Sequence, residues 1–248
     1  MRSSPIRAHL NTDSENVSPA TTFRAVSGRY PPYVNAMPRT ALWETPLPGE
    51  SLAFRAACDG DAEITRTRAT PAGAFRAARR MFLQGRRLDM GVLATELGIS
   101  RTTLYRWTGH RDQLLADVLW SLSDEIFEQA KAAHPEHLGI ERLLAIFRQH
   151  VGVLMAAEPL HIFLQQETHA ALRILTSPEG GVQPRTVWKV AELYREEEEA
   201  GAFQPRIDPG ALAYAVVRVT EGFIYHDAIA TIEPKLERAA RIVALLLE

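Results

Sequence analysis

A short stretch of the chain combines side chains that bind phosphate oxygens and the edges of nucleic-acid bases. It holds Arg101, Thr102, Thr103, Tyr105 and Arg106. An arginine can donate two hydrogen bonds to one guanine, and threonine and tyrosine hydroxyls can reach phosphate oxygens. This density of such side chains indicates contact with double-stranded DNA.

Two short helices are needed to present these side chains on one face. Asp89 is placed to cap a first helix, Ser100 to cap a second, and Gly98 to supply a left-handed turn between them. The residues expected to face inward are Leu93, Ala94, Leu97, Ile99, Leu104 and Trp107. Any two amphipathic helices joined by a glycine share part of this pattern. The small, turn and apolar residues at matching spacing favour a helix-turn-helix at about residues 89 to 107.

Charge is distributed unevenly along the chain, although its formal net charge is only -2. Residues 64–111 carry 10 basic and 2 acidic side chains, whereas residues 112–248 carry 12 basic and 21 acidic ones. A basic module joined to an acidic remainder is typical of a small domain that binds phosphate and is attached to a larger domain that does not. Chance clustering of surface arginines is the alternative that charge alone leaves open.

The rest of the chain predicts helices and no strands. Thr70 and Pro71 begin a helix closed by Gly85, and an apolar stripe predicts a long helix from about residue 111 to 133. Later segments with helical periodicity are separated by proline and glycine breaks. We therefore predict an all-α protein. Residues 63–111 form a three-helix head with the helix-turn-helix, and residues 112–248 form a helical bundle for effector binding and dimerisation.

Residues 1–62 contain seven prolines and no sustained helical period. This composition predicts a largely disordered N-terminal arm. Because Met37 could also begin a chain, the sequence leaves open whether residues 1–36 belong to the natural protein.

The stretch around the predicted turn resembles the TetR family of transcriptional regulators. The resemblance covers about residues 70–120: a helix ending in MFLQG, the unit GISRTTLYRW, and RDQLLADVL at the start of the long helix. It implies a ligand-responsive regulator, expected to be a repressor, that binds a palindromic operator as a homodimer. It also implies that Arg101, Thr102, Thr103 and Tyr105 contact DNA and that Arg111 holds a phosphate.

The chain departs from the family pattern directly after the second helix. Where the family commonly has Phe-Pro, this chain has Thr108 and Gly109, with the aromatic residue one place earlier as Trp107. This departure puts the docking angle on DNA in doubt. Within the family, the phrase YRWTGHRDQLLADVLW resembles QsdR-like regulators of quorum-signal lactone degradation, which implies a lactone or another apolar effector.

In the family the last two helices pair with their copies in a second subunit. The apolar stripes that would do so here are Leu212, Val216, Val219 and Phe223, followed by Leu236, Ala240, Val243 and Leu247. The sequence leaves open an effector-independent DNA-binding protein whose helical body is only a dimerisation scaffold.

Polar or aromatic residues on otherwise apolar helices are candidates for the wall of an effector site. They are Trp120, Phe147, Phe163, His169, Trp188 and Arg218. Ordinary core packing would also explain each of them, and Arg218 is placed to pair with Glu221.

Enzymatic chemistry is poorly supported by the sequence. A carboxylate-bridged metal site in a helical bundle needs two Glu-x-x-His pairs, but only Glu158 and His161 have that spacing, and Pro159 lies between them. There is no Walker loop, dinucleotide glycine fingerprint or zinc-like Cys/His set. The acidic run at residues 196–199 is expected to be a solvated helix end. We therefore expect no catalytic residue, cofactor or metal.

The expected compartment is the cytoplasm, with the protein associated with the nucleoid. Cys58 is the only cysteine, the start of the chain lacks the apolar stretch of a secretory signal, and no segment is apolar enough to span a membrane.

Overall fold

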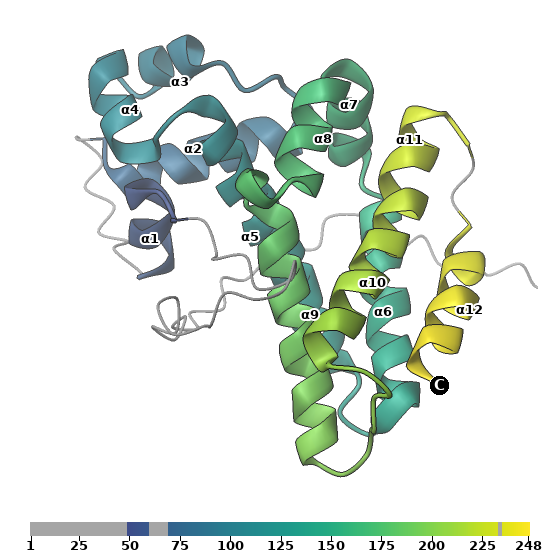
Figure 1. The fold of residues 1–248 in the computed structure, drawn as a ribbon. Helices are drawn as coiled ribbons and strands as arrows, with labels where there is room; N and C mark the ends of the chain where they lie inside the picture. Colours follow the sequence, from purple (N-terminus) through teal and green to yellow (C-terminus); the bar gives the residue numbers. More distant parts are fainter. Residues whose placement is uncertain (1–48, 60–68, 233–234) are drawn as a thin grey trace, which may run out of the picture.

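A computed structural model describes residues 49–59, 69–232 and 235–248 of the chain. Every regular element within these ranges is a helix, which confirms the predicted all-α class. Figure 1 shows a small head of short helices joined to a larger body of long ones.

The head contains α1 (Leu52–Cys58), α2 (Pro71–Leu83), α3 (Met90–Glu96) and α4 (Arg101–Thr108). Thr70 caps α2 by accepting a hydrogen bond from the Gly73 amide at 3.0 Å, and Pro71 occupies the first turn, as predicted. The core of the head is closed by Phe54 of α1 and Phe75 of α2, whose ring centroids lie 5.2 Å apart.

The sequence predicted no helix before Thr70, and α1 is therefore a difference from the prediction. Its cap is Ser51, whose hydroxyl accepts from the Phe54 amide and whose own amide donates to Asp117 of the body at 3.2 Å. The rest of the predicted arm, residues 1–48 and 60–62, lies outside the described residues.

The body follows from α5, the long helix that runs from the head down the molecule (Figure 1). Its elements are α5 (Arg111–Ala133), α6 (Gly139–Met155), α7 (Glu158–Gln166), α8 (Thr168–Thr176), η2 (Pro178–Gly180), α9 (Val182–Glu199), α10 (Pro209–Glu221), η3 (Gly222–His226), α11 (Asp227–Ile229) and α12 (Leu236–Leu247). The antiparallel pair α9 and α10 packs against α5, α6 and α12. The segment η3 is a π-helical turn that interrupts one continuous helix, and such turns are frequent at functional sites.

The predicted dimer stripes lie mostly inside the subunit. Leu212 and Val216 of α10 and Ala240, Val243 and Leu247 of α12 are buried in the subunit's own core. The periodicity correctly found an apolar face, but that face packs on α6 and α9 of the same chain. The outer face of α12 carries other apolar residues, namely Ile242 (37% exposed), Leu245 (71%) and Leu246 (39%).

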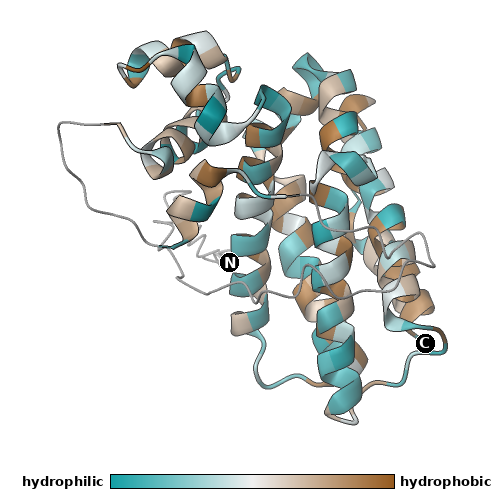
Figure 2. Ribbon diagram, turned by 60° about the vertical axis from the view of Figure 1, so that its left-hand side comes forward, coloured by the Kyte–Doolittle hydropathy of each residue, from teal (hydrophilic) through white to brown (hydrophobic). Residues whose placement is uncertain are grey.

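The acidic run at the end of α9 is largely the solvated helix end that the sequence predicted, and Figure 2 shows this tip as strongly hydrophilic. Glu197 is the exception: it is buried, accepts from the Gly139 amide at 2.7 Å and pairs with Arg142. It therefore anchors the start of α6 to the end of α9.

Candidate nucleic-acid interface and ligand cavity

Helices α3 and α4 form the predicted helix-turn-helix, and both predicted caps are present. Asp89 accepts hydrogen bonds from the Gly91 and Val92 amides at 2.7 and 2.9 Å, and these backbone bonds lower the pKa of its carboxyl group. The Ser100 hydroxyl accepts from the Thr103 amide at 3.1 Å. Both helices therefore begin at fixed residues.

The turn between α3 and α4 has the conformation that only glycine adopts easily. Gly98 has φ of +64°, and the following Ile99 amide donates to the Ala94 carbonyl at 3.0 Å, closing the end of α3. Leu104 of α4 is fully buried against Leu93, Ala94 and the rest of the head core. This packing determines which side of α4 faces outward.

The side chains predicted to contact DNA lie on that outward side. Arg101, Thr102, Tyr105 and Arg106 are exposed, with Tyr105 at 47%, whereas Thr103 is partly buried because it takes part in the Ser100 cap. The Arg101 guanidinium lies over Gly91, where any larger residue would collide with it. The outer face of α4 can thus donate charged and neutral hydrogen bonds to a phosphate backbone and to base edges.

The departure from the family pattern after α4 has a clear structural reason. Gly109 adopts φ of +66° and ψ of -156°, a conformation that is essentially restricted to glycine. Thr108 before it is fully buried, and its hydroxyl donates to the Leu104 carbonyl at 2.9 Å. This Thr-Gly pair ends α4 and turns the chain directly into α5.

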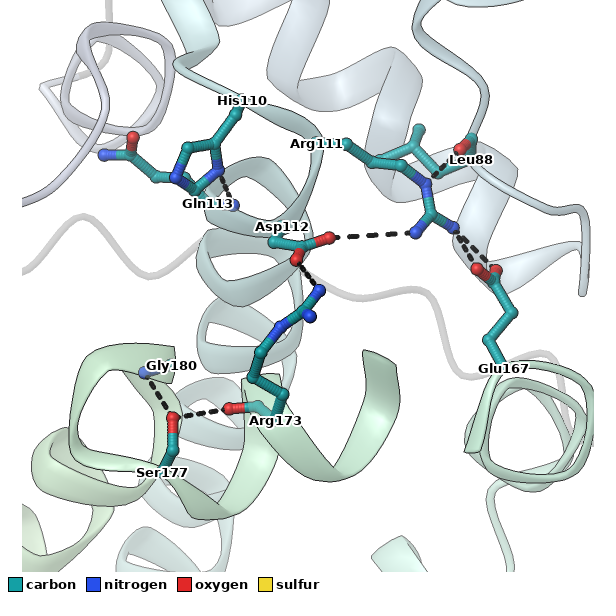
Figure 3. Close-up of polar contacts among 9 residues, drawn as sticks. All are labelled: Leu88, His110, Arg111, Asp112, Gln113, Glu167, Arg173, Ser177 and Gly180. Atoms are coloured by element: carbon teal, nitrogen blue, oxygen red, sulfur yellow. Dashed lines mark hydrogen bonds and ion pairs between the residues drawn. The ribbon is translucent and has the colours of Figure 1, made fainter. Parts of the chain in front are cut away.

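Arg111, at the start of α5, faces the junction between head and body (Figure 3). Its Nε donates to the Leu88 carbonyl at 2.6 Å, and its Nη2 donates to both carboxylate oxygens of Glu167 at 2.6 and 2.7 Å. Its contact with a DNA phosphate stays a prediction, because the guanidinium is bound to a carboxylate in this structure.

A second ion pair lies beside this junction, within the body. Arg173 of α8 pairs with Asp112 of α5, and the Ser177 hydroxyl bonds to both the Arg173 carbonyl and the Gly180 amide (Figure 3). Helices α7 and α8 are therefore tied to the first turn of α5, directly after the helix-turn-helix.

An apolar cavity lies in the body between α5, α6, α9 and α10. Its wall also includes Leu160 of α7, Leu175 of α8, and Ile224 and Tyr225 of the π-helical turn. The helices that hold the ion pairs of the junction thus also contribute to the cavity wall.

One polar group in the wall is a buried carboxylate. Glu221, at the end of α10, accepts from Gln183 Nε2 at 2.8 and 3.0 Å and from Arg218 Nη1 at 2.9 Å. Burial raises the pKa of Glu221 to about 7, against the lowering effect of the Gln183 and Arg218 contacts.

Another polar group of the wall is a neutral histidine. His150 of α6 lies 3.1 Å from the Ser123 hydroxyl, and complete burial lowers the pKa of its imidazole to about 4. The cavity is therefore apolar along most of its wall, with two hydrogen-bonded pairs in it.

Residues 138–248, from the start of α6 to the end of α12, match the family model described as the tetracyclin repressor-like C-terminal domain. This C-terminal part of the chain is thus similar to the regulators of the TetR family. Its fold is similar to the solved structure of QsdR, a TetR-family transcriptional repressor from R. erythropolis, with a TM-score of 0.64 and 27% sequence identity over 70% of this chain and 92% of that one. The predicted resemblance to this family, including its QsdR-like members, is confirmed.

A second solved structure, the fatty acid degradation regulator FadR from Bacillus halodurans, matches with a TM-score of 0.47 and 16% identity over 70% of this chain and 92% of that one. No curated protein sequence matches the chain.

Of the six residues predicted to line an effector site in the helical body, the structure places Phe147 in the cavity wall. Trp120 and Phe163 are buried in the core next to the head, and His169 is exposed on α8. Trp188 is partly buried on α9, and Arg218 reaches the cavity through Glu221, as the predicted pair requires.

Sequence reasoning missed Gln183, Ser123 and His150 as polar groups of the cavity. Each sits on the apolar face of its helix, and that signal was available in the sequence. The sequence does not show that these three residues lie close together, because they come from three different helices. In the described part of the chain no cluster of three potential metal ligands is present, and no helix is long and apolar enough to cross a bilayer.

Proposed function

We propose that this protein is a TetR-family transcriptional repressor that binds a palindromic operator as a homodimer and responds to a small-molecule effector. The observation that carries the proposal is the outward face of α4: Arg101, Thr102, Tyr105 and Arg106 are exposed on a helix that the buried Leu104 fixes in place. Recognition helices of this kind read the major groove with such side chains. A protein with this role acts at the nucleoid and needs no catalytic residue.

The body supports the sensing half of the proposal. A pure dimerisation scaffold gains nothing from a cavity, whereas this body has an apolar cavity that reaches α7 and α8. Ion pairs tie these helices to the first turn of α5, and Glu167 between them also pairs with Arg87 of the head. An effector that prefers one head orientation would change operator affinity by the coupling free energy, typically about 1 to 3 kcal/mol.

Homodimer formation supplies the second head. We assign the dimer contact to the outer face of α12, because its apolar residues Ile242, Leu245 and Leu246 are exposed and do not pack into the subunit's own core. Two heads on one side of DNA would meet half-sites about 34 to 36 Å apart, which makes the operator palindromic.

The test is selection of bound DNA from a random pool, followed by mobility-shift titration of the selected site. We expect a palindromic site, affinity that falls steeply with salt, and a loss of at least about tenfold for Arg101→Ala and for Tyr105→Ala, since each good contact is worth about 1 to 3 kcal/mol.

Arg206→Ala is the matched control, because Arg206 is an exposed arginine of the loop before α10. It should leave operator affinity unchanged. Binding that is equally strong in both α4 variants and in the wild type would overturn the assignment.

A further inference from the structure

The charge of the cavity wall indicates which ligands it can take. Among the described residues of the wall no lysine or arginine is present, and Glu221 is the one carboxylic acid. Above pH 7, where Glu221 is mostly ionised, an anionic ligand buried there would meet a carboxylate and no opposite charge in the wall. Burying an unpaired charge is strongly unfavourable.

The neighbours of Glu221 do not compensate a second negative charge. Gln183 uses its Nε2 on both oxygens of Glu221, so this donor is already occupied. Arg218 approaches from the surface, with 46% of its side chain exposed, and also donates to the Thr176 carbonyl at 3.3 Å. Its charge is therefore bound to Glu221 and screened by water.

The histidine of the wall supplies no positive charge either. Complete burial keeps His150 neutral at physiological pH, and Ser123 is its hydrogen-bond partner. Histidine and serine in this state offer hydrogen bonds to neutral polar groups.

We propose that the cavity binds an uncharged amphiphile, an apolar chain with a neutral polar head group, and that Glu221 is the specificity-determining residue that excludes carboxylates. The apolar stretch of the wall holds the chain, and the Gln183–Glu221 pair, at the end of the α9–α10 pair beside α8, meets the head group. This inference rests on the proposed function only in taking the bound molecule to be the effector.

The test measures direct binding without DNA, by calorimetry and thermal shift, on the full-length protein. The probes are octan-1-ol, octanamide and octanoate, which share a similar chain length and differ in head group. We expect the alcohol and the amide to bind at least about tenfold more tightly than octanoate at pH 8, because a ligand carboxylate would be buried beside a like charge.

Glu221→Gln should raise octanoate affinity by about tenfold and leave octanol affinity nearly unchanged, since the amide oxygen still accepts a hydrogen bond. Glu192→Gln is the matched control: it removes the same charge from a half-exposed site of α9 that pairs with Arg195, and should change neither affinity.

Octanoate binding as tight as octanamide in the wild type, or no binding of any of the three probes, overturns the proposal. If Glu221→Gln does not fold, the wild-type comparison of the probes decides alone. Because the measurement involves no DNA, its failure is distinct from a failure to bind an operator.

Discussion

At the scale of single residues, Glu221 and His150 of the cavity wall are buried groups whose protonation acts on stability in opposite directions. The pKa of Glu221 is about 7 in the folded chain against a usual value of 4.5, so the folded state keeps a proton that the unfolded state has lost between these values. Stability from this group therefore falls as pH rises from about 4.5 through 7. The pKa of His150 is about 4 against 6.5, so its contribution falls as pH decreases through that range.

Comparing Glu221→Gln with the wild type isolates the first effect, because His150 is common to both. We expect the variant to be similar to the wild type at pH 5 and more stable at pH 8, by up to about 3 kcal/mol for the full shift. Thermal or urea unfolding at several pH values measures the difference. Glu192→Gln should show no such pH trend, and a constant offset between Glu221→Gln and wild type at all pH values would contradict the shift.

The outward-facing residues of α4 were predictable one by one because their positions follow from local rules. Asp89, Gly98 and Ser100 define the ends of α3 and α4, and Leu104 then determines the outward face. The polar residues of the cavity could not be located in this way. Gln183 and Glu221 are 38 positions apart, and only the antiparallel packing of α9 and α10 brings them together.

At the scale of elements, the link between α7 and α8 connects the cavity to the head. Glu167 is the residue between the two helices, and it holds Arg111 of α5 and lies 3.6 Å from Arg87 of the loop before α3. Because α7 and α8 also line the cavity, a ligand that shifts them would move Glu167 and its partners. This contact gives a mechanical path from the cavity to the loop before the helix-turn-helix.

Glu167→Gln should loosen the head without unfolding the body. Losing a charged partner of a half-buried arginine costs about 1.5 to 3 kcal/mol, so local opening around residues 86–92 should increase by about tenfold or more. Hydrogen exchange of the backbone amides of this loop and α3 measures the effect.

The matched control for this prediction is Glu158→Gln, an exposed carboxylate at the start of α7. It should leave exchange in the head unchanged. Equal protection of α3 in Glu167→Gln and wild type would remove Glu167 from the coupling path.

Elements also differ in how far the sequence predicts them. The long helices are predicted well because each carries several turns of apolar periodicity, whereas α1 has only seven residues. Its stability comes from the contact of Phe54 with Phe75 and from the bond of Ser51 to Asp117. Tertiary contacts of this kind leave no local pattern.

At the scale of the whole molecule, the apolar stripe of α12 does not by itself reveal which chain it contacts. Periodicity finds an apolar face but does not tell whether it meets the same chain or a second copy. Val243 and Leu247 face the subunit core, so a second copy that packs on α12, as we propose, would contact the opposite side, where Leu245 is 71% exposed.

Leu245→Glu therefore tests the assembly. In a two-fold interface each substitution occurs twice, and burying a leucine is worth about 1.5 to 3 kcal/mol, so the dimer dissociation constant should rise at least about a hundredfold. Sedimentation and mass measurement over a range of concentrations should show monomers for the variant where the wild type is dimeric. Operator affinity should fall together with dimerisation, because a monomer reaches one half-site only.

Leu83→Glu is the matched control, since Leu83 is an exposed leucine of α2 in the head, remote in sequence from α12. It should leave the dimer intact. If Leu245→Glu remains dimeric at every concentration, the second copy binds elsewhere on the body. If the monomeric variant binds the full palindrome as tightly as the wild type, two heads are not needed for operator recognition, and the link from α12 to DNA affinity is lost.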